Sequence, residues 1–312
     1  KTRKAERTVI MNRKTVVKIP TLILVITFFI SVMTSCSMKD AKSTETSTKT
    51  EIKTDTIQTS DSSAINSAET SQIQTLPYDG NYPQHKAYGT GIGAMPGRVV
   101  WSHNPDSVEW DGSGYWWETE HFDEAVILQM VNDSIASFGG RNTAKDGWDA
   151  LFSANNNARN RNGGYVTGEK IAIKANINGS AVFDDDTSGK TQMSYTNPVL
   201  LKALLTSLVN EGGVNPSDIT VYDVSRLFPD YMVEMCTDGE LKGVQFVGRN
   251  NGVADENAPI NWSQKFSGKI NYLPTCVTEA AYVINLANLK GHSYGITLCG
   301  KNHFGSFING NT

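Results

Sequence analysis

A strand, a helix and a second strand follow one another between residues 170 and 223, and this order constrains the fold more than any other feature of the sequence. Lys170–Lys174 (KIAIK) is a nearly continuous apolar run, which is typical of a strand covered on both faces of a sheet. Asn197–Pro198 places a capping residue before a proline, as at the start of a helix, and Gly212–Gly213 ends that helix. Ile219–Asp223 (ITVYD) is the second strand. Because crossovers between parallel strands are right-handed, the order predicts a parallel β-α-β unit.

The flanking segments extend this unit into a mostly parallel, Rossmann-like α/β sheet with helices on both faces. Short apolar or partly apolar runs predict further strands at residues 98–101, 243–247, 269–273 and 281–286. We therefore expect one α/β domain over residues 89–312.

Three helices are predicted from apolar residues at helical spacing. The first ends at Gly139–Gly140, the second begins after the capping residue Thr143, and the third follows Asn197–Pro198. The residues predicted to be buried are Ile127, Met130, Val131, Ile135 and Phe138 in the first helix, Trp148, Leu151 and Phe152 in the second, and Val199, Leu200, Leu204, Leu205, Leu208 and Val209 in the third.

Residues 11–35 have the pattern of a bacterial lipoprotein signal peptide. Three basic side chains between residues 13 and 18 precede the apolar run Leu22–Val32, which is too short to cross the roughly 30 Å hydrocarbon core of a membrane. Small residues directly before Cys36 resemble a lipobox, which implies cleavage before Cys36 and lipidation of this cysteine. An ordinary signal peptide with an incidental cysteine is the alternative.

The segments around this signal complete the predicted N-terminal region. Residues 1–10 are expected to be an upstream in-frame extension, because the first methionine is Met11. Residues 36–88 are rich in Ser and Thr and almost free of aromatic residues, so we expect a disordered tether. Together these patterns predict a protein held in the cell envelope by a lipid anchor, in the outer membrane of a Gram-negative bacterium.

Charge and cysteine content exclude several classes of protein. Residues 1–35 hold seven Lys and Arg side chains and one Glu, so the rest of the chain carries a formal charge of −10. An acidic body without a basic stripe argues against nucleic acid as a partner. The four cysteines contain no CxxC pair, which argues against a zinc finger or an iron–sulfur ferredoxin.

Polar side chains follow three of the predicted strands at the points where those strands end. In open α/β sheets, ligands bind beyond the carboxyl ends of the strands. Converging Lys and Arg side chains favour a small anionic ligand, a carboxylate or a phosphate, and His side chains can move protons near neutral pH. The predicted ligand-binding residues are Lys174, Asn176, Asp223, Arg226, Asn288, Lys290, Lys301 and Asn302, and the predicted proton carriers are His292 and His303. The alternative is that these strand ends simply meet solvent.

These positions resemble a known family. Ile173–Asn176 (IKAN), Asn197–Pro198, Asn285–His292 (NLANLKGH), Gly295–Thr297 and Lys301–Gly305 (KNHFG) are similar, in order and spacing, to motifs of the uncharacterised bacterial and archaeal proteins known as domain of unknown function 362. The resemblance covers roughly residue 89 to the C-terminus. Ala175 stands where the family usually has Pro or Ile, and Gly291 where Thr is commoner.

The resemblance implies little chemistry. No general reaction is established for the family, and the cofactor stays unknown. Some members carry ferredoxin-type iron–sulfur modules or are exported, which implies redox work in the envelope, so one alternative function is that of a redox partner to a separate iron–sulfur protein. The family domain normally runs well past the KNHFG motif, and the chain is therefore expected to be incomplete at its C-terminus.

A second alternative function comes from a tryptophan-rich segment. Trp101, Trp110, Trp116 and Trp117 lie within 17 residues and could stack on sugar rings, as in a non-catalytic glycan-binding module of the cell surface. The favoured interpretation is that they pin an irregular loop onto the sheet.

Three other patterns in the sequence bear on candidate sites. Asp184–Asp186 could bind Ca²⁺, although it lacks the alternating spacing of a calcium loop and a solvated turn is favoured. The five histidines show no HxH or HExxH spacing, so no metal site is predicted. Cys236, Cys276 and Cys299 could supply one disulfide or stay as buried thiols, and the sequence leaves both open.

Overall fold

The computed structural model describes residues 29–30, 89, 91–181, 185–263, 270–293 and 295–309. The predictions for the upstream extension, the signal peptide, Cys36 and the tether therefore lie outside the described residues, apart from the two-residue strand β1 (Phe29–Ile30). β1 pairs in parallel with β2 (Trp101–Ser102). In the part of the chain that the structure covers, no helix is both long and apolar enough to cross a membrane.

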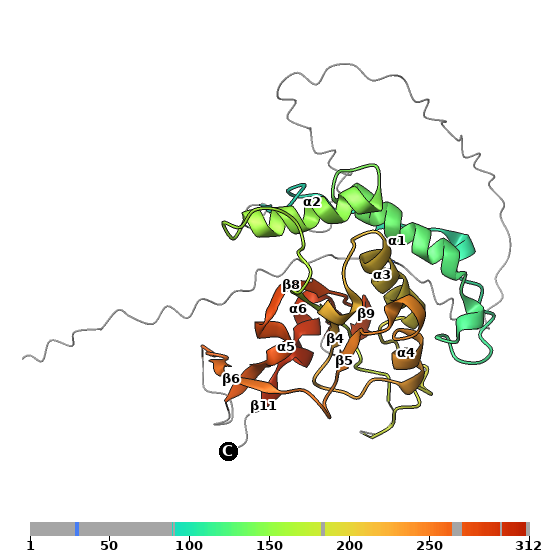
Figure 1. The fold of residues 1–312 in the computed structure, drawn as a ribbon. Coiled ribbons are helices and arrows are strands. Elements are labelled where there is room, and N and C mark those ends of the chain that lie inside the picture. The colour runs from blue at the N-terminus through green and yellow to red at the C-terminus, as the bar shows by residue number, and fades with distance from the viewer. Residues whose placement is uncertain are drawn as a thin grey trace, which may run out of the picture. The chain divides into compact units, whose positions relative to one another are not determined.

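The central sheet has four parallel strands in the order β5-β4-β3-β8 (Figure 1). Its strands are β3 (Lys170–Lys174), β4 (Ile219–Tyr222), β5 (Gln245–Val247) and β8 (Ala280–Asn285). The parallel crossover from β3 to β4 and the mostly parallel α/β fold are confirmed. All four carboxyl ends meet at one edge, which we call the carboxyl edge.

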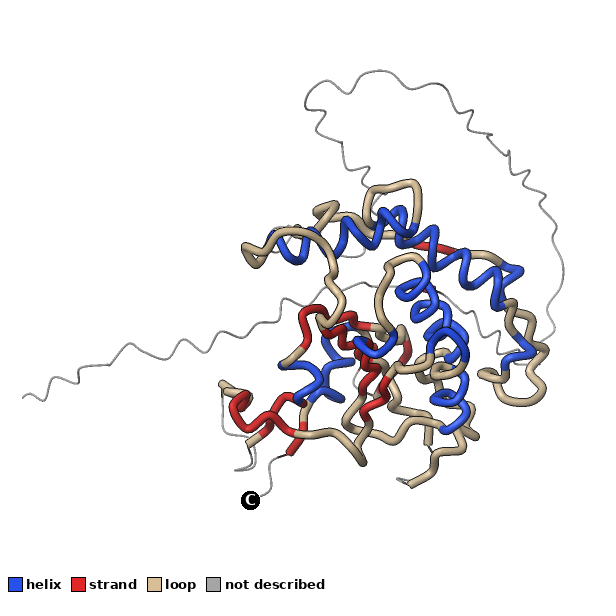
Figure 2. Tube along the Cα trace, viewed as in Figure 1, coloured by secondary structure: helices blue, strands red, loops and turns tan. Residues whose placement is uncertain are grey.

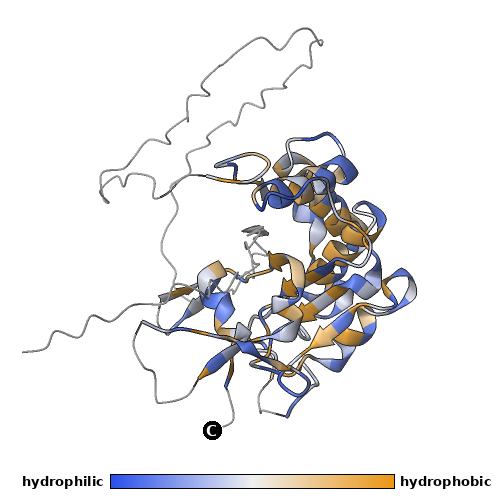
Figure 3. Cartoon of the chain, turned by 60° about the vertical axis from the view of Figure 1, so that its left-hand side comes forward, coloured by the Kyte–Doolittle hydropathy of each residue, from blue (hydrophilic) through white to orange (hydrophobic). Residues whose placement is uncertain are grey.

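Three long helices lie on one side of this sheet (Figure 2). α3 (Pro198–Asn210) connects β3 to β4, α1 (Glu124–Phe138) packs on α3, and α2 (Ala144–Asn157) packs on α1. Each helix begins at a side-chain cap, because Asn197, Asp123 and Thr143 accept hydrogen bonds from backbone N–H groups of the first turn. Figure 3 shows the apolar residues gathered on the central strands and on the helices beside them.

On the opposite face of the sheet, the helices among the described residues are short. α5 (Thr275–Thr278) places Val277 in a small core with Ala172, Tyr222 and Val283. α6 (Cys299–Asn302) and the 3₁₀ helix η5 (His303–Ser306) follow one another near the end of the described chain. Helices thus cover both faces, as predicted, although those on this face are single turns.

The remaining strands form two small antiparallel sheets. β7 (Asn271–Pro274) lies between β11 (Ile308–Asn309) and β6 (Ala254–Pro259), and β9 (Lys290–His292) pairs with β10 (Gly295–Thr297). The strand predicted near residues 269–273 is thus β7, outside the parallel sheet. The other helical turns are α4 (Asp230–Met235), η1 (Pro105–Ser107), η2 (Thr119–His121), η3 (Pro216–Asp218) and η4 (Gly239–Leu241).

Two local predictions differ from the structure. Residues 98–100 are not a strand, and only Trp101–Ser102 pairs. In α3, Leu201 is fully buried whereas Leu200 and Val209 are half-buried. One row of apolar residues along a helix is expected when only one side of the helix is buried. α3 packs on the sheet and is also covered by α1.

Candidate functional site

The carboxyl edge is built around a buried ion pair. Lys174, the last residue of β3, lies between Tyr222 of β4 and Asn285 of β8 and is fully buried. Its Nζ atom is 3.0 Å from Oδ2 of Asp223, which directly follows β4. Burial lowers the pKa of Lys174, and the Asp223 carboxylate opposes this shift.

Every proton of the Lys174 ammonium has an acceptor. Besides the carboxylate, Nζ donates to the Ala175 carbonyl at 2.5 Å and to Oδ1 of Asn302 at 3.4 Å. Asp223 in turn accepts the backbone N–H of Ile177 at 2.9 Å and both the N–H and the hydroxyl of Ser225. Buried charges are tolerated when they are paired and hydrogen-bonded in this way. In this arrangement Lys174 has no N–H left for a ligand.

A row of hydrogen bonds extends from Lys174 to Tyr222. Nδ2 of Asn302 donates to Oδ1 of Asn285 at 2.8 Å, and Nδ2 of Asn285 lies 3.1 Å from Nε2 of His303. Since an amide nitrogen only donates, Nε2 of His303 is the acceptor and the ring proton sits on Nδ1, 3.0 Å from Oγ of Ser306. Ser306 then meets the Tyr222 hydroxyl at 3.1 Å. We call these five residues, with Lys174 and Asp223, the inner network.

Burial lowers the pKa of His303 to about 4, and the positive charge of Lys174 adds to this shift. His303 is therefore neutral near pH 7, with both ring nitrogens already hydrogen-bonded.

Gly305 allows the segment that carries this network to lie against the strand ends. The Gly305 carbonyl accepts the N–H of Val224 at 2.9 Å. A Cβ atom at position 305 would lie 2.8 Å from Nζ of Lys174 and would overlap the Asp223 carboxylate. The KNHFG motif thus closes over the ion pair, and a side chain in place of Gly305 would push it away.

A second set of polar groups lies farther out on the same edge. Nζ of Lys290 donates to the carbonyls of Asn178 and Ser194, each at 2.5 Å. Nη2 of Arg226 donates to Oδ1 of Asn178 at 3.1 Å, and Nδ2 of Asn288 donates to Oγ of Ser194 at 3.3 Å. We call these five residues the outer rim.

The two cations of the outer rim lack acidic partners. Among the described residues, neither Lys290 nor Arg226 forms a salt bridge. Burial lowers the pKa of Lys290 to about 8, while the charge of Asp223 acts in the opposite direction.

The structure thus divides the predicted site residues. Lys174, Asp223, Asn302 and His303 belong to the inner network, and Arg226, Asn288 and Lys290 belong to the outer rim. Asn176 is buried between the strands and residue Thr196, whose N–H donates to its carbonyl at 2.8 Å. His292 and Lys301 are half-buried in β9 and α6 and join neither set through the hydrogen bonds given above.

Sequence reasoning missed several members of both sets. Asn285 ends the apolar strand β8 and is fully buried, which is the same signal that pointed to Lys174. Ser306 and Tyr222 had no distinguishing pattern, because an isolated hydroxyl is common in any strand or turn. Asn178 and Ser194 each contribute a side-chain oxygen and a backbone carbonyl, and no sequence pattern marks the carbonyls.

The tryptophan-rich segment packs into the core in part. Trp117 stacks on Tyr231 with ring centroids 4.2 Å apart, and Trp116 meets Tyr195 edge-on at 5.0 Å. Both tryptophans are buried, so their faces are not open to a sugar, whereas Trp101 is exposed and stacks on His103. This packing is what the loop-pinning interpretation requires.

The other candidate sites gain no support. Asp184 lies outside the described residues, and Asp186 accepts the N–H of Ser188 in a local turn. Cys236 and Cys276 are free thiols in the structure. Over the described ranges, no group of three His, Cys, Asp or Glu side chains is placed to hold a metal ion.

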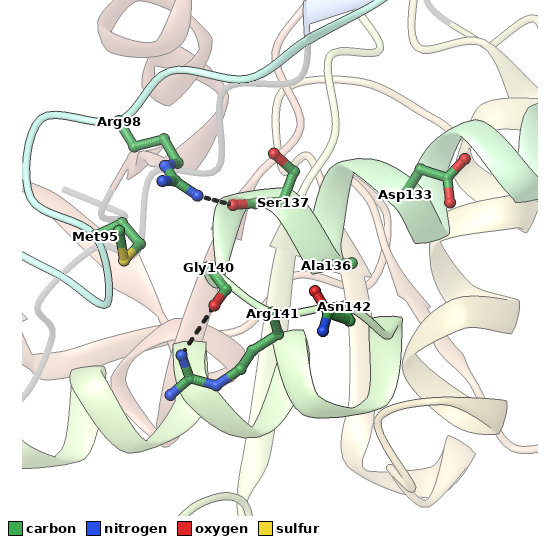
Figure 4. Close-up of a pocket in the computed structure, with 8 residues that line it drawn as sticks. All are labelled: Met95, Arg98, Asp133, Ala136, Ser137, Gly140, Arg141 and Asn142. Atoms are coloured by element: carbon green, nitrogen blue, oxygen red, sulfur yellow. Dashed lines mark hydrogen bonds between the residues drawn. The ribbon is translucent and has the colours of Figure 1, made fainter. Parts of the chain in front are cut away.

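A hollow of about 550 Å³ lies away from this edge, at the elbow between α1 and α2 (Figure 4). Two arginines line it, but Arg98 donates to the Ser137 carbonyl at 2.6 Å and Arg141 to the Gly140 carbonyl at 3.0 Å. Both contacts complement the carbonyl-rich end of α1. Asp133 also lines the hollow, so it has no strong preference for an anion.

Comparison with known families identifies the domain to which this edge belongs. Residues 171–311 match the family model described as Domain of unknown function (DUF362). That range holds the whole parallel sheet apart from the first residue of β3, and every predicted ligand-binding residue. This match confirms, over residues 171–311, the resemblance found in the sequence. The match begins at Ile171 and does not extend to residue 89.

Neither the curated proteins nor the solved structures contain a match to the chain. The function of the carboxyl edge must therefore be argued from its own chemistry.

The inner network predicts a loss of stability in acid. The ordinary histidine pKa of 6.5 falls to about 4 for His303 in the folded protein. Between these values the unfolded chain binds a proton that the folded protein does not, so stability is lost as pH falls from 6.5 towards 4. Urea unfolding at pH 6.5 and pH 4.5 should show His303 contributing roughly 1 to 2 kcal/mol to this loss, once solvent screening is allowed for.

His303→Gln should make unfolding less sensitive to acid by that amount. His103→Gln, at an exposed histidine, is the matched control and should leave the pH dependence unchanged. Equal pH dependence in the wild-type protein and His303→Gln would contradict the description of the network.

Proposed function

We propose that the protein binds a small anionic ligand, a carboxylate or a phosphate, at the carboxyl edge of its parallel sheet. The observation that carries this proposal is the local excess of positive charge. Asp223 neutralises Lys174, and Lys290 and Arg226 remain without a carboxylate partner among the described residues. Two unneutralised cations on one edge of an otherwise acidic body favour an anion there.

The outer rim holds these cations in a geometry suited to an anion. Asn178 joins them, because its carbonyl accepts from Lys290 and its side-chain oxygen accepts from Arg226. The Lys290 ammonium uses two of its three protons on carbonyls, which leaves one N–H for a ligand oxygen. The guanidinium of Arg226 supplies further donors in a planar fork.

The amino end of α3 adds to the positive potential. This helix has 13 residues and begins at Asn197, next to Thr196, whose N–H bonds to Asn176 at the carboxyl edge. The backbone dipoles of a helix give its amino end a partial positive charge. Helix and cations therefore favour the same class of ligand.

His292 is the better placed of the two proposed proton carriers. It lies two positions after Lys290 in β9, and alternate residues of a strand share one face. His303 has both ring nitrogens committed to Asn285 and Ser306. In this proposal, any acid–base chemistry on a bound ligand uses His292, and His303 stabilises the structure of the carboxyl edge.

Replacing Lys290 tests the proposed site directly. Lys290→Met should weaken the binding of inorganic phosphate or citrate by about tenfold or more, as one charge-assisted hydrogen bond is lost. Isothermal titration calorimetry gives the affinities. Affinity in the wild-type protein should also fall as pH rises through about 8, because Lys290 then loses its proton.

Lys242→Met serves as the matched control, since Lys242 is an exposed lysine in the loop before β5, at the opposite edge of the sheet. It should bind anions as the wild-type protein does. The proposal fails if phosphate and citrate show no binding, or if Lys290→Met and Lys242→Met bind them equally well.

We further propose that the domain is exported and anchored by lipid on Cys36 in the cell envelope, with the following Ser/Thr-rich segment as its tether. The support is the lipobox-like sequence before Cys36. Expression in a bacterium fed radiolabelled palmitate should label the wild-type protein and leave Cys36→Ser unlabelled. Equal labelling of both, or of neither, would overturn the anchor.

A further inference from the structure

Three of the buried polar atoms without partners belong to loops of the outer rim. Buried polar groups in folded proteins nearly always have a hydrogen-bond partner, so exceptions call for an explanation. Oδ1 of Asn176, Oγ of Ser180 and Nδ2 of Asn197 have no partner within the described residues. These three residues are only 4%, 1% and 9% exposed.

The three groups belong to the two loops that Lys290 joins. Lys290 bonds to the carbonyls of Asn178 and Ser194. In the sequence, Asn176 and Ser180 flank Asn178. Asn197 follows Ser194 by three residues. The loops are also fastened directly, since the N–H of Asn176 donates to Oγ1 of Thr196 at 2.7 Å. The unpartnered groups therefore belong to the two loops that Lys290 fastens together at the outer rim.

The chemistry of these groups tells one kind of ligand from another. The amide of Asn197 is fixed, because its Oδ1 accepts the N–H of Leu200 at 3.0 Å, so its Nδ2 is a free donor. Oδ1 of Asn176 is an acceptor, and a carboxylate or phosphate oxygen cannot donate to it. A ligand hydroxyl both donates and accepts, and so can serve Asn176, Asn197 and Ser180.

We infer that the ligand carries hydroxyl groups next to its anionic group, as a polyol phosphate or a hydroxy acid does. This inference rests on the proposed anion site. Lys290 and Arg226 hold the anionic group, and Asn176, Ser180 and Asn197 bind the hydroxyls. A site that hydrogen-bonds a hydroxyl discriminates against the analogue that lacks it, because the site's polar groups are then left unpaired.

Glycerol 3-phosphate and propyl phosphate are the matched probes, since they share a phosphate and a three-carbon chain and differ in hydroxyls. Titration calorimetry on the full chain should show glycerol 3-phosphate binding about tenfold more tightly. In Ser180→Ala and in Asn176→Ala this ratio should fall below about threefold. Ser217→Ala, at an exposed serine of the opposite edge, is the control and should keep the wild-type ratio.

The melting temperature without ligand provides a second readout. Ser180→Ala should leave it unchanged or raise it, because the hydroxyl that is removed is unpartnered in the free protein. Equal affinities for the two probes, or a Ser180→Ala variant that keeps the tenfold ratio, would overturn this inference while leaving the anion site intact. Failure of inorganic phosphate and both probes to bind would remove the anion site and this inference with it.

Discussion

The ion pair between Lys174 and Asp223 determines how the carboxyl edge is built. Taking two charges out of water costs several kcal/mol per ion, and their attraction offsets this only when the remaining protons and lone pairs are also bonded. Here β3 supplies the lysine and the loop after β4 supplies the aspartate. The oxygens of Asn302 and Ala175 accept the other two ammonium protons. Segments far apart in the chain are therefore held together by one pair of charges.

This requirement explains why the KNHFG motif lies where it does. Asn302 supplies an acceptor for Lys174, His303 links Asn285 to Ser306, and Gly305 lets the backbone approach the carboxylate. The motif therefore covers the carboxyl edge and has a structural role. Ligand contact falls instead to the outer rim, where Lys290 and Arg226 are bonded to Asn178 but have no carboxylate partner among the described residues.

The sequence was sufficient to predict features that depend on local pattern. Lys170–Lys174 and Ile219–Asp223 are apolar runs, and Asn197–Pro198 is a helix start, so the parallel unit could be predicted before the structure was known. The family was also identifiable from motif order alone. The same predicted topology singled out polar residues near the strand ends. The structure places three of the predicted residues, Lys174, Asp223 and Asn302, in one network.

Features that depend on tertiary contact could not be predicted. Whether a strand joins the parallel sheet or a separate one depends on its partner, so the sequence could predict β7 as a strand but could not predict that it lies outside the parallel sheet. Leu201 is buried because α1 covers a second side of α3, which no single-helix periodicity contains. All three ammonium protons of Lys174 are hydrogen-bonded, whereas Lys290 keeps one N–H for a ligand. This difference depends on where the backbone carbonyls lie. Residue types alone do not give those positions.

The central claim is that Lys174 and Asp223 stabilise the fold as a pair, and a double-mutant cycle of unfolding free energies tests it most directly. Lys174→Met leaves the Asp223 carboxylate buried without its cation, and Asp223→Asn leaves the ammonium without its anion, so each should cost about 3 to 5 kcal/mol. The double variant removes both charges and should cost at least about 2 kcal/mol less than the two single costs combined. Single costs that add to within about 0.5 kcal/mol would show that the two side chains act independently and would contradict the account.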